Sequence, residues 1–244
     1  MNDCTRPGNA LRDDHLLPVA ELIHRVRNDY TRTISLASAL AKNSSSDETK
    51  AALHEVITEM RSTAEIHNVL SPPRREGVAD FAGVLARLCC AMTASSAVQH
   101  RGIKFVLRVE SPIVIDAGRC WRASLAVAEL INNSFRHAFP LRSGSIFITV
   151  GESCDRVFCD VSDDGSPGEI GGAGLGTRLV DALAAELDGR AERRFSNSGA
   201  SVILSFAKTG PIEVSQPDEY PVGEMNLHRR HHVSGAVDAD ACDF

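Results

Sequence analysis

Residues 129–137 read Glu-Leu-Ile-Asn-Asn-Ser-Phe-Arg-His, inside a helical pattern that runs from about residue 118 to residue 139. Successive residues of a helix advance by about 100° around its axis, so residues four, three and one apart share a face. One face of this predicted helix therefore carries Glu129, Asn133, Arg136 and His137. The apolar residues of the pattern lie on the other side and are expected to pack on a sheet.

The polar face of this helix suits a metal–phosphate group. The amide oxygen of Asn133 is a hard ligand of the kind that Mg²⁺ accepts together with phosphate oxygens and water. Arg136 and His137 can meet phosphate oxygens from the same face. Polar residues also simply cover the wet side of an amphipathic helix, so this segment alone does not decide between the two interpretations.

Two further stretches follow in an order that suits a nucleotide. A strand pattern ending at residue 161 runs into Ser-Asp-Asp-Gly, where the Asp163 carboxylate can accept a hydrogen bond from an exocyclic amine. Gly165 would let the backbone approach the ring closely. A glycine-rich loop then opens another helix, and its N–H groups suit a phosphate. The candidate residues of this loop are Gly172, Gly174, Leu175, Gly176 and Thr177.

Taken together, the three stretches resemble the boxes of the GHKL (Bergerat-fold) ATPase superfamily. Residues 129–137 match its N box, residues 163–165 its first glycine box and residues 174–176 its second. The resemblance implies an α+β sandwich, a mixed sheet with helices on one face. It also implies that ATP and Mg²⁺ are the cofactors, that Asn133 holds Mg²⁺ and that Asp163 reads the adenine amino group. Glu129 becomes a candidate catalytic residue, and Ser201 a residue that assists adenine binding.

Upstream, two helical patterns at residues 18–41 and 47–70 are joined by a short polar loop, which predicts an antiparallel hairpin with Asp47 as the second N-cap. Each helix has an apolar stripe that one hairpin buries only in part, so two copies are expected to form a four-helix bundle as a homodimer. His24 lies opposite the stripe of the first helix. An exposed histidine usually has no role, although its ring nitrogen can act as a nucleophile near neutral pH.

Residues 22–28, Leu-Ile-His-Arg-Val-Arg-Asn, resemble the His-Arg-x-Lys-Asn phosphoacceptor box of the second class of bacterial histidine kinases, close to the HWE kinases. This resemblance implies a two-component histidine kinase that autophosphorylates on His24 from Mg-ATP. The phosphoryl group would pass to an aspartate of a response regulator receiver domain, and a separate sensor protein is a further expected partner. Arg27 stands in place of the usual Lys, the Trp-x-Glu signature is absent, and the lid between Gly165 and Gly174 is short.

Three alternative functions share parts of this pattern. A histidine phosphotransferase would use the same dimeric hairpin without ATP-dependent kinase activity, but such proteins typically have eroded nucleotide boxes, and here the boxes are largely intact. An anti-sigma-type Ser/Thr kinase would lack the histidine-bearing hairpin. A GHKL ATP hydrolase that acts as a conformational clamp is disfavoured by the short lid. The kinase is therefore the preferred interpretation.

Composition supports a protein of the reducing cytoplasm. The net charge of −6 gives no reason to expect nucleic acid as a partner, and no apolar run approaches the roughly 20 residues that span a bilayer, so no membrane partner is expected. None of the seven cysteines forms a C-x-x-C pair, so we expect structural thiols. The predicted parts are a disordered N-terminus (1–16), the dimerisation and histidine-phosphotransfer hairpin (17–74), the GHKL catalytic domain (75–208) and a disordered tail (209–244).

Overall fold

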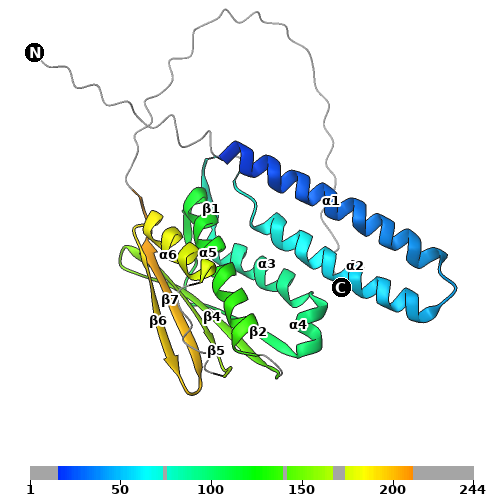
Figure 1. The fold of residues 1–244 in the computed structure, drawn as a ribbon. Helices are drawn as coiled ribbons and strands as arrows, with labels where there is room; N and C mark the ends of the chain where they lie inside the picture. The colour runs from blue at the N-terminus through cyan, green and yellow to red at the C-terminus, as the bar shows by residue number, and fades with distance from the viewer. Residues whose placement is uncertain (1–15, 74–75, 140–141, 167–173, 211–244) are drawn as a thin grey trace, which may run out of the picture. The chain divides into compact units, whose positions relative to one another are not determined.

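The computed structural model describes residues 16–73, 76–139, 142–166 and 174–210 of the chain, with side chains from Arg25 onward apart from Arg27. The two predicted termini therefore lie almost entirely outside the described residues. The first described elements are α1 (Leu16–Asn43) and α2 (Asp47–Val69), which pack as an antiparallel hairpin (Figure 1). Ala37, Ala41 and Ile57 are buried in it.

The cap of α2 differs from the predicted one. Ser46, not Asp47, is the N-cap, and its hydroxyl accepts a hydrogen bond from the N–H of Thr49 at 3.2 Å. Asp47 instead lies in the first turn, where its negative charge still favours the helix N-terminus. Either residue type can cap, so the sequence did not separate the two positions.

After the hairpin the chain forms two β-sheets and four further helices within the described residues. The elements are β1 (Val78–Asp80), α3 (Phe81–Thr93), α4 (Ser96–Arg101), β2 (Ile103–Val109), β3 (Val114–Asp116), α5 (Ala117–His137), β4 (Gly144–Ser153), β5 (Arg156–Asp163), α6 (Leu175–Glu186), β6 (Arg190–Ser196) and β7 (Gly199–Ala207).

The main sheet has five strands in the order β2-β4-β5-β7-β6. Strands β2 and β4 pair in parallel, and the remaining neighbours are antiparallel. β1 and β3 form a separate antiparallel pair. The parallel β2–β4 pair needs a crossover, which α5 supplies. The predicted mixed sheet is thus confirmed.

Helices α3, α5 and α6 cover one face of this sheet (Figure 1). Side chains alternate along each strand, so that Ile146, Ile148 and Val150 of β4 are fully buried under the helices while Phe147 faces out. Phe81 of α3 meets Phe206 of β7 edge to face, with ring centroids 5.9 Å apart. Full burial of such a side chain contributes about 1.5–3 kcal/mol, so this layer supplies most of the driving force for the fold.

None of the described helices is both long and apolar enough to cross a bilayer.

Candidate functional site

Helix α5 presents the predicted polar face at the surface. Asp116 caps the helix, accepting a hydrogen bond from the N–H of Arg119 at 2.9 Å. Ala123, Val127 and Ile131, on the side of α5 that faces the sheet, are buried. On the other side, Glu129 and Asn133 are half-buried, whereas Arg136 and His137 in the last turn are exposed. The structure therefore brings these four predicted site residues together on one face.

Asp163 is the last residue of β5 and is only 7% exposed. Its Oδ1 accepts hydrogen bonds from the N–H of Gly165 at 3.1 Å and the N–H of Ala200 at 3.3 Å. Among the residues that the structure describes, these hydrogen bonds fix the carboxylate through Oδ1 alone. Oδ2 is left as an acceptor on a carboxylate whose orientation is set by the backbone.

The start of β7 reaches Asp163 because residue 199 is glycine. Gly199 has a φ of +130°, and a side-chain Cβ there would clash with the carbonyl oxygen of Asp163. The close approach places the Ala200 N–H on the carboxylate. Sequence reasoning missed Gly199 and Ala200, although a Ser-Asn-Ser-Gly turn between two strand patterns is a hairpin signal that could have directed attention to them.

Ser201 is not brought to Asp163. Its hydroxyl donates to Asp160 Oδ1 at 2.8 Å, and Ser201 pairs with Ser162 across the two strands. Side chains alternate between faces, so residues 160, 162 and 201 share the sheet face opposite to that of Asp163. The role of Ser201 in adenine binding stays a prediction.

The first turn of α6 lies against Glu129. A Cβ at Gly176 would clash with the Glu129 carboxylate, so glycine at this position allows the contact. Gly174 is the N-cap and provides no side-chain oxygen for the first N–H groups of the helix. Such N–H groups favour an anion. Leu175 is 86% exposed and Thr177 is half-buried.

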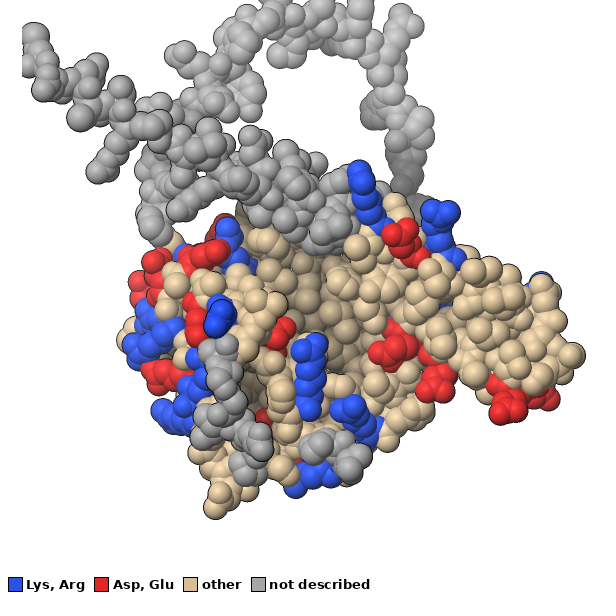
Figure 2. All heavy atoms as spheres, in the orientation of Figure 1, with Lys and Arg blue, Asp and Glu red and all other residues tan. Residues whose placement is uncertain are grey.

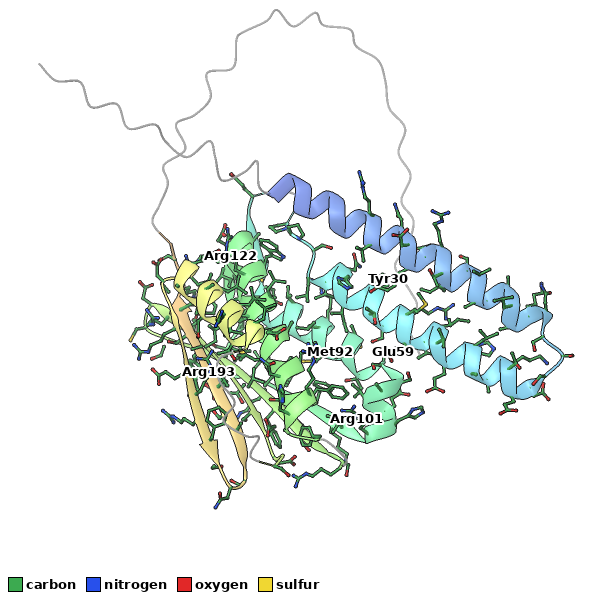
Figure 3. The ribbon with its side chains drawn as sticks, in the orientation of Figure 1. Tyr30, Glu59, Met92, Arg101, Arg122 and Arg193 are labelled. Atoms are coloured by element: carbon green, nitrogen blue, oxygen red, sulfur yellow. The ribbon has the colours of Figure 1, made fainter. Side chains whose placement is uncertain are left out.

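Ion pairs on both sides hold α6 in this place. Arg122 of α5 pairs with Glu186 of α6 at 2.9 Å, and Arg193 of β6 pairs with Asp181 of α6 at 2.8 Å (Figure 3). Positive and negative side chains are correspondingly interspersed over α6 and β6 in Figure 2. Exposed pairs of this kind contribute about 0.2–1 kcal/mol each, so they orient α6 more than they stabilise the fold.

Two further predicted residues lie wholly or partly outside the described ranges. The backbone of His24 lies within α1, but its side chain is outside the described residues, as is Gly172. Across the described ranges, no group of three or more His, Cys, Asp or Glu side chains could hold a metal ion. A Mg²⁺ ion bound to one amide oxygen and to nucleotide phosphates does not require such a group, so the half-buried Asn133 fits that ion.

Comparisons with known proteins agree on one family. A family model described as histidine kinase matches residues 21–96. The sensor histidine kinase PdtaS of Mycolicibacterium smegmatis is 30% identical over 179 residues, 70% of this chain and 35% of the relative. PdtaS of Mycobacterium tuberculosis (strain CDC 1551) is 30% identical over 195 residues, 76% of this chain and 38% of the relative. The chain thus spans less than two-fifths of the length of these curated relatives.

A solved structure has the same fold. The histidine kinase domain from the blue-light activated histidine kinase of Erythrobacter litoralis superposes with a TM-score of 0.52 at 17% sequence identity. The match covers 73% of this chain and 96% of that domain. The resemblance predicted from residues 22–28 and from the three boxes is therefore confirmed.

Proposed function

This chain belongs to the histidine kinases, and we propose that it phosphorylates His24 with ATP and passes the phosphoryl group to an aspartate of a response regulator receiver domain. The matched residues, 21–96, contain His24 and the whole of α2. The observation that carries the ATP assignment is the buried Asp163 carboxylate, held by two backbone N–H groups with Oδ2 left to accept the adenine amino group.

The proposed roles follow from the positions of the side chains. Asp163 reads the adenine, while the uncapped N–H groups at the start of α6 face the phosphates. Asn133 would hold Mg²⁺, which when bound neutralises phosphate charge. Arg136 and His137, both exposed on the same face of α5, would contact phosphate oxygens. Glu129, packed against the first turn of α6, would set the position of that turn beside the phosphates.

The transfer step needs no strong base. A neutral imidazole nitrogen of His24 forms a bond to the γ-phosphorus while the bond to the bridging oxygen breaks and ADP leaves. The ring then loses its remaining N–H proton to solvent. Catalysis consists mainly of positioning and of charge neutralisation by the site described above.

We also propose that the hairpin, residues 17–74, forms a homodimer and that residues 75–208 act as the catalytic domain. Large apolar side chains remain exposed on both helices, with Leu36 at 61%, Leu40 at 52% and Val56 at 49%. Pairing two hairpins would bury these side chains in a four-helix bundle. Five described cysteines are free thiols, which supports a reducing cytoplasmic location.

The proposal is tested by incubating the protein with γ-labelled ATP and Mg²⁺. Acid-labile, alkali-stable label is expected on the wild type and on His54→Ala, which alters another histidine of the hairpin. Label is expected to be absent from His24→Ala and from Asn133→Ala, both still folded. Undiminished labelling of either variant would contradict the assignment. A folded wild type that takes no label from ATP, but accepts phosphate from a response regulator, would instead be a phosphorelay protein.

A further inference from the structure

Arg119 joins the C-terminal end of α6 to two other parts of the fold. It lies in the first turn of α5, and its Nη2 donates hydrogen bonds to the carbonyl oxygen of Leu187 at 2.6 Å and to that of Ala207 at 2.8 Å. Leu187 directly follows α6, and Ala207 is the last residue of β7. The Nη1 atom is 4.0 Å from the carboxylate of Asp188. One guanidinium therefore holds α5, α6 and β7 together at the end of the sheet away from Asp163.

The surroundings of Arg119 are unusual for a charged residue. Its side chain is only 11% exposed, so the guanidinium has lost most of its hydration. Among the described residues its buried Nε has no hydrogen-bond partner, which destabilises the fold. Its positive charge does complement the carbonyl groups at the C-terminal end of α6. Stability alone therefore does not account for an arginine at this position, whereas a need to fix the end of α6 does.

Helix α6 carries the effect of this end to its other end. It lies beside α5, with its last turn at Arg119 and Arg122 and its first turn at Glu129 (Figure 1). Its 12 residues span about 18 Å. A tilt of about 10° around the Leu187 end would therefore move the first N–H groups of the helix by about 3 Å. A hydrogen bond from these groups to a phosphate oxygen would not survive a shift of that size.

The adenine half of the proposed site is held independently of Arg119. Oδ1 of Asp163 accepts the N–H groups of Gly165 and Ala200. The pairing of β7 with β5 begins at Ser201, next to Ala200, so the ladder itself keeps this N–H beside Asp163. Loss of the Arg119 hydrogen bonds should thus disturb the N-terminus of α6 and leave the adenine acceptor in place.

We propose that Arg119 is a positioning residue for the phosphate half of the nucleotide site: it fixes the last turn of α6 on α5 and β7, and so directs the first N–H groups of α6 at the phosphates. The inference rests on the proposed kinase function. It separates two contributions to nucleotide binding, because adenosine needs only the Asp163 half of the site, whereas ADP needs both halves.

The test compares ADP with adenosine by calorimetric titration in the presence of Mg²⁺, on the wild type and on Arg119→Gln. The affinity for ADP should fall at least about tenfold, as expected for the loss of one hydrogen bond to a charged group. The affinity for adenosine should stay nearly unchanged, because Asp163 keeps its position. Equal losses for the two ligands would indicate a merely structural role. That result, or an unchanged affinity for ADP, would overturn the proposal.

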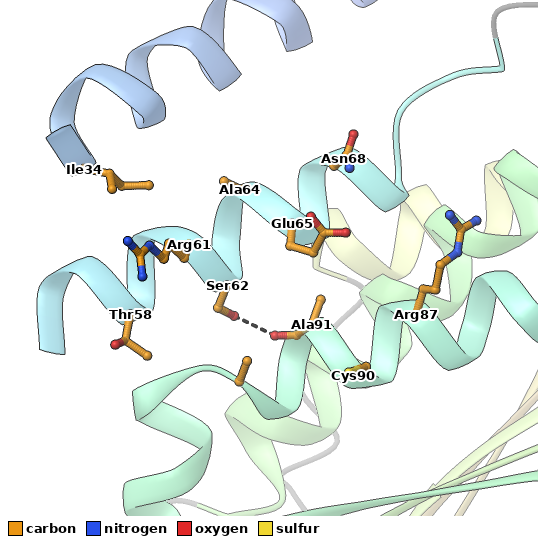
Figure 4. A pocket seen from close by; sticks show the side chains of 11 residues that line it. Ile34, Thr58, Arg61, Ser62, Ala64, Glu65, Asn68, Arg87, Cys90 and Ala91 are labelled. Carbon is orange, nitrogen blue, oxygen red and sulfur yellow. Dashed lines mark hydrogen bonds between the residues drawn. The ribbon is translucent and has the colours of Figure 1, made fainter. Parts of the chain in front are cut away.

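Arg87→Gln is the matched control for the loss of a positive charge. Arg87 lies on α3 and lines the groove between α2 and α3, where Ser62 donates a hydrogen bond to the carbonyl oxygen of Ala91 at 2.7 Å (Figure 4). Because this guanidinium lies in that groove, Arg87→Gln should bind both ligands as the wild type does. A loss of ADP affinity as large as that of Arg119→Gln would show an effect of net charge and would overturn the positioning role.

Arg119→Lys decides the question if Arg119→Gln fails to fold. A lysine keeps the charge at the end of α6 but lacks the planar guanidinium that reaches two carbonyl oxygens at once. The affinity for ADP should fall while that for adenosine stays, and an affinity for ADP equal to that of the wild type would overturn the proposal. A wild type that neither binds ADP nor takes label from ATP would overturn the kinase function itself, so the two failures are distinguishable.

Discussion

The substitution Asp163→Asn separates the proposed role of this residue in adenine binding from its role in the fold. Oδ1 accepts N–H groups from Gly165 and Ala200, and an amide oxygen can accept both in its place. The amide nitrogen then takes the position of Oδ2. Two donor groups, this amide and the adenine amino group, would face each other where the wild type is proposed to make a hydrogen bond.

The expected magnitude follows from the type of bond lost. A hydrogen bond to a charged acceptor is worth about 1.5–3 kcal/mol, so ATP affinity should fall roughly 10- to 150-fold. The free energy of unfolding should change by less than about 1 kcal/mol, since no buried N–H loses its acceptor. Asp163→Ala differs, because two N–H groups lose their acceptor at about 1–3 kcal/mol each. The affinity of Asp163→Asn for GTP relative to ATP should rise, because the guanine keto oxygen can accept a hydrogen bond from the new amide.

Calorimetric titration with a non-hydrolysable ATP analogue and Mg²⁺ measures the affinities, and urea denaturation measures the stabilities. Retained ATP affinity in Asp163→Asn would refute the assignment of Asp163 to adenine. Equal loss of stability in the Asn and Ala variants would refute the claim that Oδ1 carries the structural role alone.

Two further outcomes are expected. Gly176→Ala should leave the free energy of unfolding within about 1 kcal/mol of the wild type, because the flexible end of the Glu129 side chain can move aside. Labelling from ATP should nevertheless fall at least about tenfold. Unchanged labelling would contradict a role for the contact between Gly176 and Glu129. Burial raises the pKa of Cys89 from 9.0 to about 11, so above pH 9 the unfolded thiol ionises first. The free energy of unfolding should therefore fall by up to about 2.7 kcal/mol between pH 9 and 11. Urea denaturation of Cys89→Ala should show a smaller fall over the same pH range. An equal fall in the variant would contradict the contribution of the Cys89 thiol.

Local patterns were sufficient to predict the layers of the fold. The helical period of residues 118–139 predicted α5, which occurs with nearly the expected bounds. Alternation of apolar and polar residues along residues 145–150 corresponds to β4. Residues 78–98 have a continuous helical pattern in the sequence, but the structure divides them into β1, α3 and α4. The break falls at Ser95, whose hydroxyl donates to Glu59, and a partner 36 residues away leaves no local signal.

The positions of the candidate site residues on their helices and strands were predicted better than the residues that surround them. Asn133 and Asp163 were found because their neighbours form recognisable motifs. Ala200 was missed and Ser201 was chosen, since the phase of a strand decides which side chains share a face. That phase is set by pairing with β5, in which Ser201 lies opposite Ser162. Nothing in the sequence of β7 itself contains this information.

The hydrogen bond from Ala200 to Asp163 also bears on how the protein folds. β4 and β5 form a hairpin whose last paired residues are Ser153 and Arg156, and β6 and β7 form one whose last paired residues are Ser196 and Gly199. Hairpins of this kind form in about 1–10 μs. The Ala200–Asp163 bond spans 37 residues, so it forms only when β7 docks on β5, after the entropy of closing a longer loop has been overcome. The proposed adenine acceptor is therefore oriented in part by a contact that requires β7 to be docked on β5. A molecule opened between β5 and β7 would lack this contact, so nucleotide bound at the proposed site would disfavour that opening.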